Sequence, residues 1–224
     1  MRYLDLFSGV GGFTLGIQQA YEEFCNVDRS KNGGSEENKE RNKRERLQSE
    51  KGEEISSSER PVSERNNNII NERPLCIGYS EIDKYAIQVY KKHFNHKNYG
   101  DITKINEKEL PDFDLLVGGF PCQSFSIAGN RMGFEDTRGT LIYDVFRIIK
   151  EKHPRTVLLE NVKGLLSHDK GRTFKTIITS LNELGYAVEW QVLNAKNFGV
   201  PQNRERVFII GHIGGFGGRK VFPI

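Results

Sequence analysis

The stretch YLDLFSGVGGFTLGIQQAYEEF, residues 3–24, decides the fold because it joins a strand to a helix through a run of glycines. Tyr3–Phe7 is apolar apart from Asp5 and predicts a buried strand, residues 9–12 predict a tight turn, and Phe13–Phe24 predicts a helix. A glycine turn at such a junction lets the backbone approach a ligand closely, with the ligand's polar end at the helix start. The pattern predicts an α/β protein with a ligand beyond the carboxyl end of this strand.

The rest of the chain alternates short apolar runs with amphipathic stretches, which is typical of an α/β protein with a doubly wound, mostly parallel sheet. Further strands are expected at Leu75–Ser80, Leu115–Gly118, Thr156–Glu160, Ala187–Leu193 and Arg206–Gly211. Further helices are expected at Lys84–Phe94, Leu141–Lys152 and Thr173–Leu184, the last closed by Gly185.

One segment, residues 28–73, differs sharply from the rest in composition. It holds 11 acidic and 11 basic residues, no aromatic residue and only five Leu, Ile or Val. Such a segment cannot offset its conformational entropy by burial, so we expect a disordered surface insertion, with a nucleic-acid-binding arm as the alternative. The predicted organisation is one globular body from residues 1–27 and 74–214, this charged insertion, and a tail at 215–224.

Composition excludes several classes of protein. Hydrophobic residues make up 36% of the chain, and no stretch approaches the ~18 uncharged apolar residues of a membrane span. Asp5 interrupts what would be the apolar region of a signal peptide. Three cysteines without a CxxC pair argue against a disulfide framework or a zinc site. A cytoplasmic protein with reduced thiols is therefore expected, and the net charge of +3 indicates nucleic acid only weakly.

Two carboxylates stand at predicted strand ends. Glu81 follows Leu75–Ser80, and once residues 28–73 are set aside it lies about 23 positions after the glycine turn, the spacing of a carboxylate that binds ribose hydroxyls. Glu160 ends the run VLLE, and a carboxylate leaving a buried strand tends toward a raised pKa that suits proton transfer. Alone, each residue is also compatible with a solvated acid or a turn cap.

A thiol and two arginines complete the candidate residues. Cys122 follows Pro121 at a strand-to-loop junction in GGFPCQSFS, where a thiol can be exposed and activated as a nucleophile. Without that context it reads as a packing residue, as Cys25 and Cys76 do. Arg204 and Arg206 lie two apart at a predicted strand, so both side chains can face one polar ligand or acid, although a surface charge pair fits equally well.

Taken together, these motifs resemble the DNA (cytosine-5)-methyltransferase family. The matching pieces, in order, are DLFSGVGG, SEIDKYA, GDI, GGFPCQSFS, RGTLIYD, ENV and LNAKNFGVPQNRERVFIIG. They span nearly all of the chain outside residues 28–73, and GFPCQ followed by ENV and QxRxR is a specific combination. The resemblance implies a class I, Rossmann-like methyltransferase fold and the transfer of a methyl group from S-adenosylmethionine to carbon 5 of cytosine in DNA, leaving S-adenosylhomocysteine.

The resemblance also implies roles for individual residues. Glu81 would take the cofactor's ribose hydroxyls, Ile82 would cover the adenine, and Asp101 and Ile102 would read the adenine edge. The full set of implied cofactor contacts is Phe7, Gly9, Gly11, Gly12, Glu81, Ile82, Asp101, Ile102, Pro121 and Leu141.

Four residues would act on the base. Cys122 would add to carbon 6 of the cytosine, Glu160 would hold ring nitrogen 3 and the exocyclic amine, and Arg204 and Arg206 would lie on the strand beside it. Double-stranded DNA with a flipped cytosine is the implied partner, since an atom inside a duplex is unreachable, and no metal is implied. The loop Ser124–Asp136 is the expected lid over the base.

The C-terminus departs from the family pattern. Family members continue past the QxRxR strand into a target-recognition domain and a closing segment, and nothing after Gly211 is long enough for either. The expected readings are a truncated product, the catalytic subunit of a split enzyme whose second chain supplies recognition, or an inactive cofactor-binding remnant. A bacterial or phage restriction–modification role, with nucleoid association if bacterial, is the expected setting, and a cytosine in tRNA is the alternative substrate.

Overall fold

The computed structural model describes residues 1–32, 73–121, 141–215 and 221–222. Cys122, the loop Ser124–Asp136 and residues 33–72 of the expected insertion lie outside the described residues. The chain divides into two compact units, one of Met1–Thr14 with Leu75–Ile224 and one of Leu15–Pro74. The larger unit holds the sheet and every candidate site residue that the structure describes.

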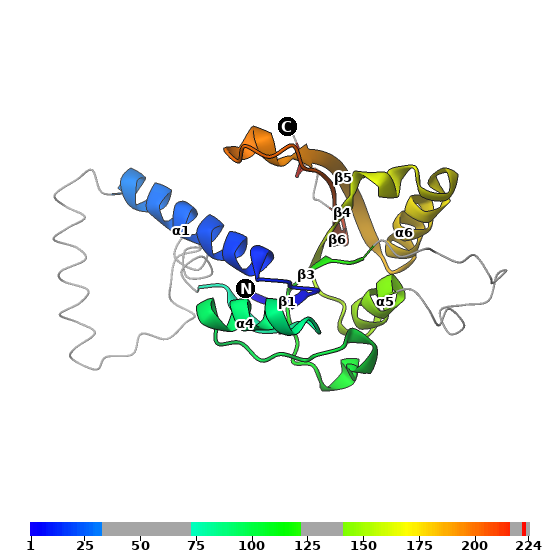
Figure 1. Ribbon diagram of the computed structural model, residues 1–224, viewed down its shortest axis with the longest axis horizontal. Helices are drawn as coiled ribbons and strands as arrows, with labels where there is room; N and C mark the ends of the chain where they lie inside the picture. The colour runs from blue at the N-terminus through cyan, green and yellow to red at the C-terminus, as the bar shows by residue number, and fades with distance from the viewer. Residues whose placement is uncertain (33–72, 122–140, 216–220, 223–224) are drawn as a thin grey trace, which may run out of the picture. The chain divides into compact units, whose positions relative to one another are not determined.

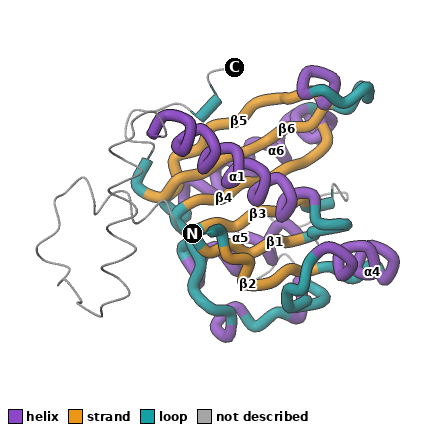
Figure 2. Tube along the Cα trace, turned by 90° about the vertical axis from the view of Figure 1, so that its left-hand side faces the viewer, coloured by secondary structure: helices purple, strands orange, loops and turns teal. Residues whose placement is uncertain are grey.

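The larger unit is built on one mixed sheet of six strands (Figures 1 and 2). Its strands are β1 (Arg2–Leu6), β2 (Leu75–Ser80), β3 (Leu115–Gly119), β4 (Thr156–Val162), β5 (Tyr186–Asn194) and β6 (Glu205–Ile213). They lie in the order β2-β1-β3-β4-β6-β5. The first four strands of that order are parallel, and β6 runs antiparallel to both β4 and β5. This is the mostly parallel sheet that the sequence predicts.

One face of the sheet is covered by α5 (Leu141–Lys152) and α6 (Arg172–Glu183), which lie behind the strands in Figure 2. The buried side chains of α5 recur at helical spacing and meet the alternate residues of the strands, Leu4 and Leu6 among them. Ile177 and Leu181 of α6 join the same core. Burial of this apolar face explains why these segments form helices where predicted.

The opposite face carries a smaller aromatic layer from α4 (Lys84–His93). The ring of Tyr90 stacks on that of Tyr79 with their centroids 3.8 Å apart, and both side chains are fully buried. Thr14, in the first turn of α1 (Gly12–Asn32), is buried on this face beside Asp5. Helical residues therefore cover both faces, as a doubly wound α/β fold requires.

Short 3₁₀ turns lie in several of the connections between these helices and strands. Beside β2, Tyr79 forms an isolated parallel bridge with Asn98. The 3₁₀ turns are η1 (Ile102–Lys104), η2 (Glu107–Glu109), η3 (Lys163–Leu166), η4 (His168–Gly171) and η5 (Ala195–Phe198). No helix in the described parts of the chain is long and apolar enough to span a membrane.

Helix α1 runs further than predicted. The sequence predicts its end at Phe24, yet it continues to Asn32 and takes in the first five residues of the segment expected to be disordered. The prediction followed the loss of apolar residues, but a helix also persists through charged residues when no glycine or proline interrupts it. None occurs between Ile17 and Asn32, and Gly33 and Gly34 follow directly.

Candidate functional site

The turn between β1 and α1 has the backbone that its glycines predict. Gly9 and Gly11 have φ values of 54° and 96°, in the left-handed region that favours glycine. A Cβ on Gly11 would lie 2.7 Å from the ring of Phe94 and 3.0 Å from that of Tyr90, so packing excludes a side chain there. A Cβ on Gly9 or Gly12 would meet nothing within 4 Å, which leaves that side of the turn open to a ligand.

Glu81 is bonded to this turn. Its Oε2 accepts a hydrogen bond from the N–H of Gly9 at 2.9 Å, and its Oε1 accepts from the N–H groups of Ile82 and Asp83 at 2.8 Å each. The fold thus brings the glycine turn and Glu81 together across the insertion. The neighbouring Ile82 side chain is 73% exposed, as expected of a residue available to cover a planar ligand.

A residue that the sequence analysis missed, Asn98, links Glu81 to the next segment. Its Oδ1 accepts from the N–H of Glu81 at 3.3 Å and of Gly100 at 2.8 Å, and its Nδ2 donates to the carbonyl of Glu81 at 3.1 Å. Asp101 follows and caps η1, and hydrogen bonds from Thr103 hold the pKa of Asp101 below its usual value. Asn98 therefore joins Glu81 to the segment that begins at Gly100.

Asp5 of the DLF motif lies beneath the turn and faces away from solvent. It is fully buried, and one carboxyl oxygen accepts from the hydroxyl of Thr14 at 2.9 Å. That hydroxyl lies 3.3 Å from the Tyr90 hydroxyl, which in turn lies 2.9 Å from Nδ1 of His96. Burial, with a smaller contribution from the charge of Glu81, raises the pKa of Asp5 to about 7. Asp5 therefore supports the turn from inside the protein.

Glu160 emerges from β4 beside the end of β3. It is paired with Gly119 in the sheet register, and its Oε2 lies 3.1 Å from where a Cβ on Gly119 would be. Its Oε1 lies 2.8 Å from Nε of Arg206, and the two side chains are 23% and 20% exposed. The absence of a side chain at Gly119 leaves room for a carboxylate that Arg206 orients.

Arg204 does not share this arrangement. Strand β6 begins at Glu205, so Arg206 lies on the strand and Arg204 precedes it. The N–H of Arg204 donates to Oδ1 of Asn194 at 3.2 Å, its carbonyl accepts from Ala195 at 3.0 Å, and the residue is exposed. The expectation that both arginines belong to the strand is wrong for Arg204. Its backbone bonds to Asn194 and Ala195 close the loop before β6, and the strand begins at the next residue, Glu205.

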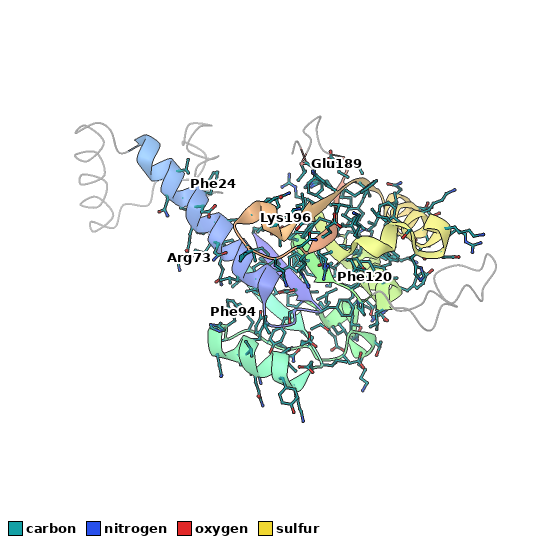
Figure 3. The ribbon with its side chains drawn as sticks, turned by 45° about the horizontal axis from the view of Figure 1, so that its top comes forward. Phe24, Arg73, Phe94, Phe120, Glu189 and Lys196 are labelled. Atoms are coloured by element: carbon teal, nitrogen blue, oxygen red, sulfur yellow. The ribbon has the colours of Figure 1, made fainter. Side chains whose placement is uncertain are left out.

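Asn161, also missed from sequence, ties the ends of β3 and β4 together. Its buried Nδ2 donates to the carbonyl of Phe120 at 2.8 Å, and its Oδ1 accepts from the N–H of Val162 at 2.8 Å. Phe120, labelled in Figure 3, follows the end of β3 and precedes the exposed Pro121. Cys122 itself lies outside the described residues. Asn161 therefore fixes the backbone two residues before the candidate nucleophile.

The candidate residues gather at one edge of the sheet. Because β1, β2, β3 and β4 are parallel, their carboxyl ends bring the glycine turn, Glu81, Pro121 and Glu160 to the same side. Leu141 opens α5 and is half-buried, and Phe7 has a left-handed φ of 54°. Within the described ranges, no group of three or more His, Cys, Asp or Glu side chains could hold a metal ion.

Comparison with known proteins shows the family to which this chain belongs. Residues 70–216 match the model of the C-5 cytosine-specific DNA methylase family. The type II methyltransferase M1.ScrFI of Lactococcus lactis subsp. cremoris is 61% identical over 140 residues, which cover 62% of this chain and 36% of the relative. The type II methyltransferase M.BsuFI of Bacillus subtilis is 54% identical over 211 residues, which cover 94% of this chain and 39% of the relative.

A solved structure shares the fold. The methyltransferase EhMeth of Entamoeba histolytica superposes with a TM-score of 0.56 at 17% identity, covering 98% of this chain and 55% of that one. The chain thus spans well under half the length of M1.ScrFI and M.BsuFI, and about half that of EhMeth.

Proposed function

Because this chain belongs to the C-5 cytosine-specific DNA methylase family, we propose that it carries the catalytic part of an enzyme that methylates carbon 5 of cytosine in DNA. The observation that carries the proposal is the Glu160–Arg206 ion pair, which lies beside the strand end that leads into Pro121 and Cys122. A restriction–modification setting follows from the relatives, which are named type II methyltransferases.

The cofactor in this proposal is S-adenosylmethionine, and the residues present fit it. Space is open beside Gly9 and Gly12, where a ligand can approach the backbone. Glu81 has spare lone pairs beside its bonds to Gly9, Ile82 and Asp83, and these can accept the ribose hydroxyls. Ser8 adds a buried hydroxyl with no hydrogen-bond partner among the described residues. The remaining contacts proposed are those of Phe7, Gly11, Ile82, Asp101, Ile102, Pro121 and Leu141.

The base would be activated by Cys122 and Glu160 acting from opposite sides of its ring. The Cys122 thiolate forms a bond to carbon 6 while Glu160 supports a proton at nitrogen 3, so electron density reaches carbon 5. The bound cofactor supplies an electrophilic methyl group. Loss of the carbon 5 proton then breaks the bond to sulfur and releases the Cys122 thiolate. Arg206 keeps the Glu160 carboxylate oriented through this sequence.

DNA is the substrate proposed, with the target cytosine flipped out of the duplex. A tRNA substrate is not favoured, because M1.ScrFI and M.BsuFI, at 61% and 54% identity, are named type II methyltransferases, which accompany DNA restriction.

The test is a methylation assay on DNA, with nucleosides separated and identified by mass spectrometry. The wild-type protein is expected to produce 5-methylcytosine, and Glu160→Gln is expected to lower its rate of formation by roughly 10²–10⁴-fold, the usual contribution of a positioned proton donor. Binding of S-adenosylhomocysteine should stay within about twofold, because Glu160 belongs to the base side of the site. Methylation at another position of the base would contradict the proposal.

A further inference from the structure

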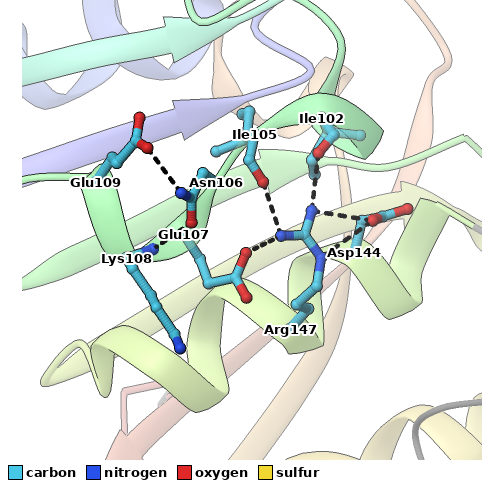
Figure 4. A network of polar contacts seen from close by, with 8 residues as sticks. All are labelled: Ile102, Ile105, Asn106, Glu107, Lys108, Glu109, Asp144 and Arg147. Carbon is cyan, nitrogen blue, oxygen red and sulfur yellow. Dashed lines mark hydrogen bonds and ion pairs between the residues drawn. The ribbon is translucent and has the colours of Figure 1, made fainter.

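Arg147, on α5, uses its whole guanidinium to hold a neighbouring turn (Figure 4). Its Nη2 donates to the carbonyl of Ile102 at 3.0 Å, and its Nη1 donates to the carbonyl of Ile105 at 2.8 Å. Nε and Nη2 contact Oδ1 of Asp144 at 3.3 and 3.1 Å, and Nη1 also donates to Glu107. These contacts match the five N–H donors of an arginine, so no donor is left for another partner.

The turn that Arg147 holds begins at Asp101. Its backbone closes through hydrogen bonds from Lys104 to Asp101 and from Ile105 to Ile102, and the side chains of Ile102 and Ile105 are 3% and 7% exposed. Apolar burial thus fixes the turn from below, while Arg147 fixes the direction of its carbonyl groups. Loss of Arg147 would leave the core contacts in place and release the orientation of the backbone.

The charges around Arg147 make this hold specific to arginine. Two carboxylates and two carbonyl oxygens, all acceptors, converge on one guanidinium. A lysine at 147 would keep the charge, but its three donors sit on one nitrogen and cannot replace the five N–H contacts that Arg147 makes with four acceptor groups. Without a suitable cation, the carboxylates of Asp144 and Glu107 would repel the carbonyls of the turn and move it away from α5.

We propose that Arg147 is a positioning residue for cofactor recognition. It sets the orientation of Asp101 and Ile102, and so the preference of the site for adenine over bases with a different hydrogen-bonding edge. This inference rests on the proposed function, which assigns Asp101 and Ile102 to the adenine edge. It adds a residue on α5, more than 40 positions after Ile102 in sequence, that governs which purine the cofactor site prefers.

The test compares two ligands that differ only at that edge. Adenine presents an amino donor and a ring-nitrogen acceptor, whereas hypoxanthine presents a carbonyl acceptor and a ring N–H donor. Isothermal titration calorimetry with S-adenosylhomocysteine and S-inosylhomocysteine is expected to show a clear preference of the wild type for the adenine ligand. Arg147→Lys is expected to bind the adenine ligand at least 10-fold more weakly and the hypoxanthine ligand within threefold of wild type.

Two further variants keep the test decisive. Glu107→Gln retains an acceptor but removes one charge, so it should fold even where Arg147→Lys does not and should show a smaller loss of preference. Lys152→Met, on the same helix, removes the ion pair with Asp112 at 3.2 Å and should leave both affinities unchanged.

The outcomes separate this inference from the proposed function. Unchanged preference in Arg147→Lys and Glu107→Gln, whether both affinities stay or fall together, would overturn the positioning role while leaving the cofactor assignment standing. Failure of the folded wild type to bind S-adenosylhomocysteine at all would overturn both.

Discussion

Asp5 carries a carboxyl group into a fully buried position below the glycine turn of residues 9–12. Its pKa of about 7 follows from burial, since water no longer stabilises the charge, and the Thr14 hydroxyl only partly compensates. One of its oxygens has no hydrogen-bond partner among the described residues. A group held in this way favours its neutral form in the folded protein across the mildly acidic range.

The first prediction concerns the pH dependence that Asp5 imparts. Its folded pKa lies above the unfolded value of 3.8, so the stability it contributes is complete below about pH 4 and is lost as the pH rises to 7. Asn at this position does not titrate. The free energy of unfolding of Asp5→Asn relative to wild type should therefore rise by about 2.5 kcal/mol between pH 5 and pH 8. Urea unfolding at both pH values measures this, and a constant difference would contradict it.

The second prediction separates two adjacent glycines. Gly11→Ala places a methyl group against Tyr90 and Phe94 at a φ of 96°, so a loss of about 3 kcal/mol in the free energy of unfolding is expected. Gly12→Ala meets open space at an ordinary φ, so its stability should change by less than about 0.5 kcal/mol. Its affinity for S-adenosylhomocysteine should fall instead. Thermal unfolding measures the change in stability and calorimetry measures the change in affinity. Equal destabilisation by both variants would contradict this prediction.

Polar side chains bonded to distant backbone were the part of the site that sequence could not predict. Asn98, Asn161 and Arg147 each act on main-chain groups, and neither a motif nor a spacing reports such a partner before the fold is known. Gly9 and Glu81 were predictable because the spacing between a glycine turn and its carboxylate is set by one βαβ unit. The Glu160–Arg206 pair was predictable only as two candidates, because register decides which arginine faces the acid.

At the scale of elements, the ends of β3 and β4 act as one support for the site. Their paired register brings Gly119 beside Glu160, and Asn161 bonds to the carbonyl of Phe120. Strand positions were predicted closely because runs of buried apolar residues mark them directly. The length of α1 was not, because apolar residues become sparse after Phe24, while the absence of glycine and proline up to Asn32 lets the helix continue.

The third prediction tests the link between these two strands. Asn161→Ala leaves the Phe120 carbonyl without its donor, so the free energy of unfolding should fall by about 1–3 kcal/mol. The turnover number for DNA methylation should fall as well, while S-adenosylhomocysteine affinity stays within about twofold. Lys163→Ala, which removes an exposed ion pair with Glu205, is the control and should cost less than about 1 kcal/mol. Full turnover in Asn161→Ala would contradict the role assigned to this link.

For the whole molecule, the sheet core is formed by segments on both sides of the charged stretch. Leu4 and Leu6 from the N-terminal segment pack in one cluster with residues from β3 to β6. Strand β1 lies between β2 and β3, so the two sides of the insertion are joined in the sheet by backbone pairing. The carboxyl edge of the parallel strands is thus continuous in space although the charged segment interrupts it in sequence.

The fourth prediction follows from that continuity. Replacing residues 34–71 by a short Gly–Ser linker should change the thermal unfolding midpoint by less than about 3 °C, the shift that ~1 kcal/mol produces in a domain of this size. The reason is compositional, since this stretch offers almost no apolar side chains for burial. Differential scanning calorimetry measures the midpoint, and loss of a cooperative transition would show that the segment is needed for folding.

The proposed mechanism requires Cys122 to form a covalent bond to the cytosine that Glu160 holds. DNA containing 5-fluorocytosine tests this directly. Release of the thiolate needs loss of a proton from carbon 5, and fluorine in place of that hydrogen cannot be removed in the same way, so the bond between carbon 6 and the Cys122 sulfur persists after methyl transfer. With S-adenosylmethionine present, mass spectrometry of the digested complex should find the modified base on the peptide that contains Cys122, and Cys122→Ala should form no complex. Attachment at another residue, or 5-methylcytosine formed by Cys122→Ala, would contradict the account.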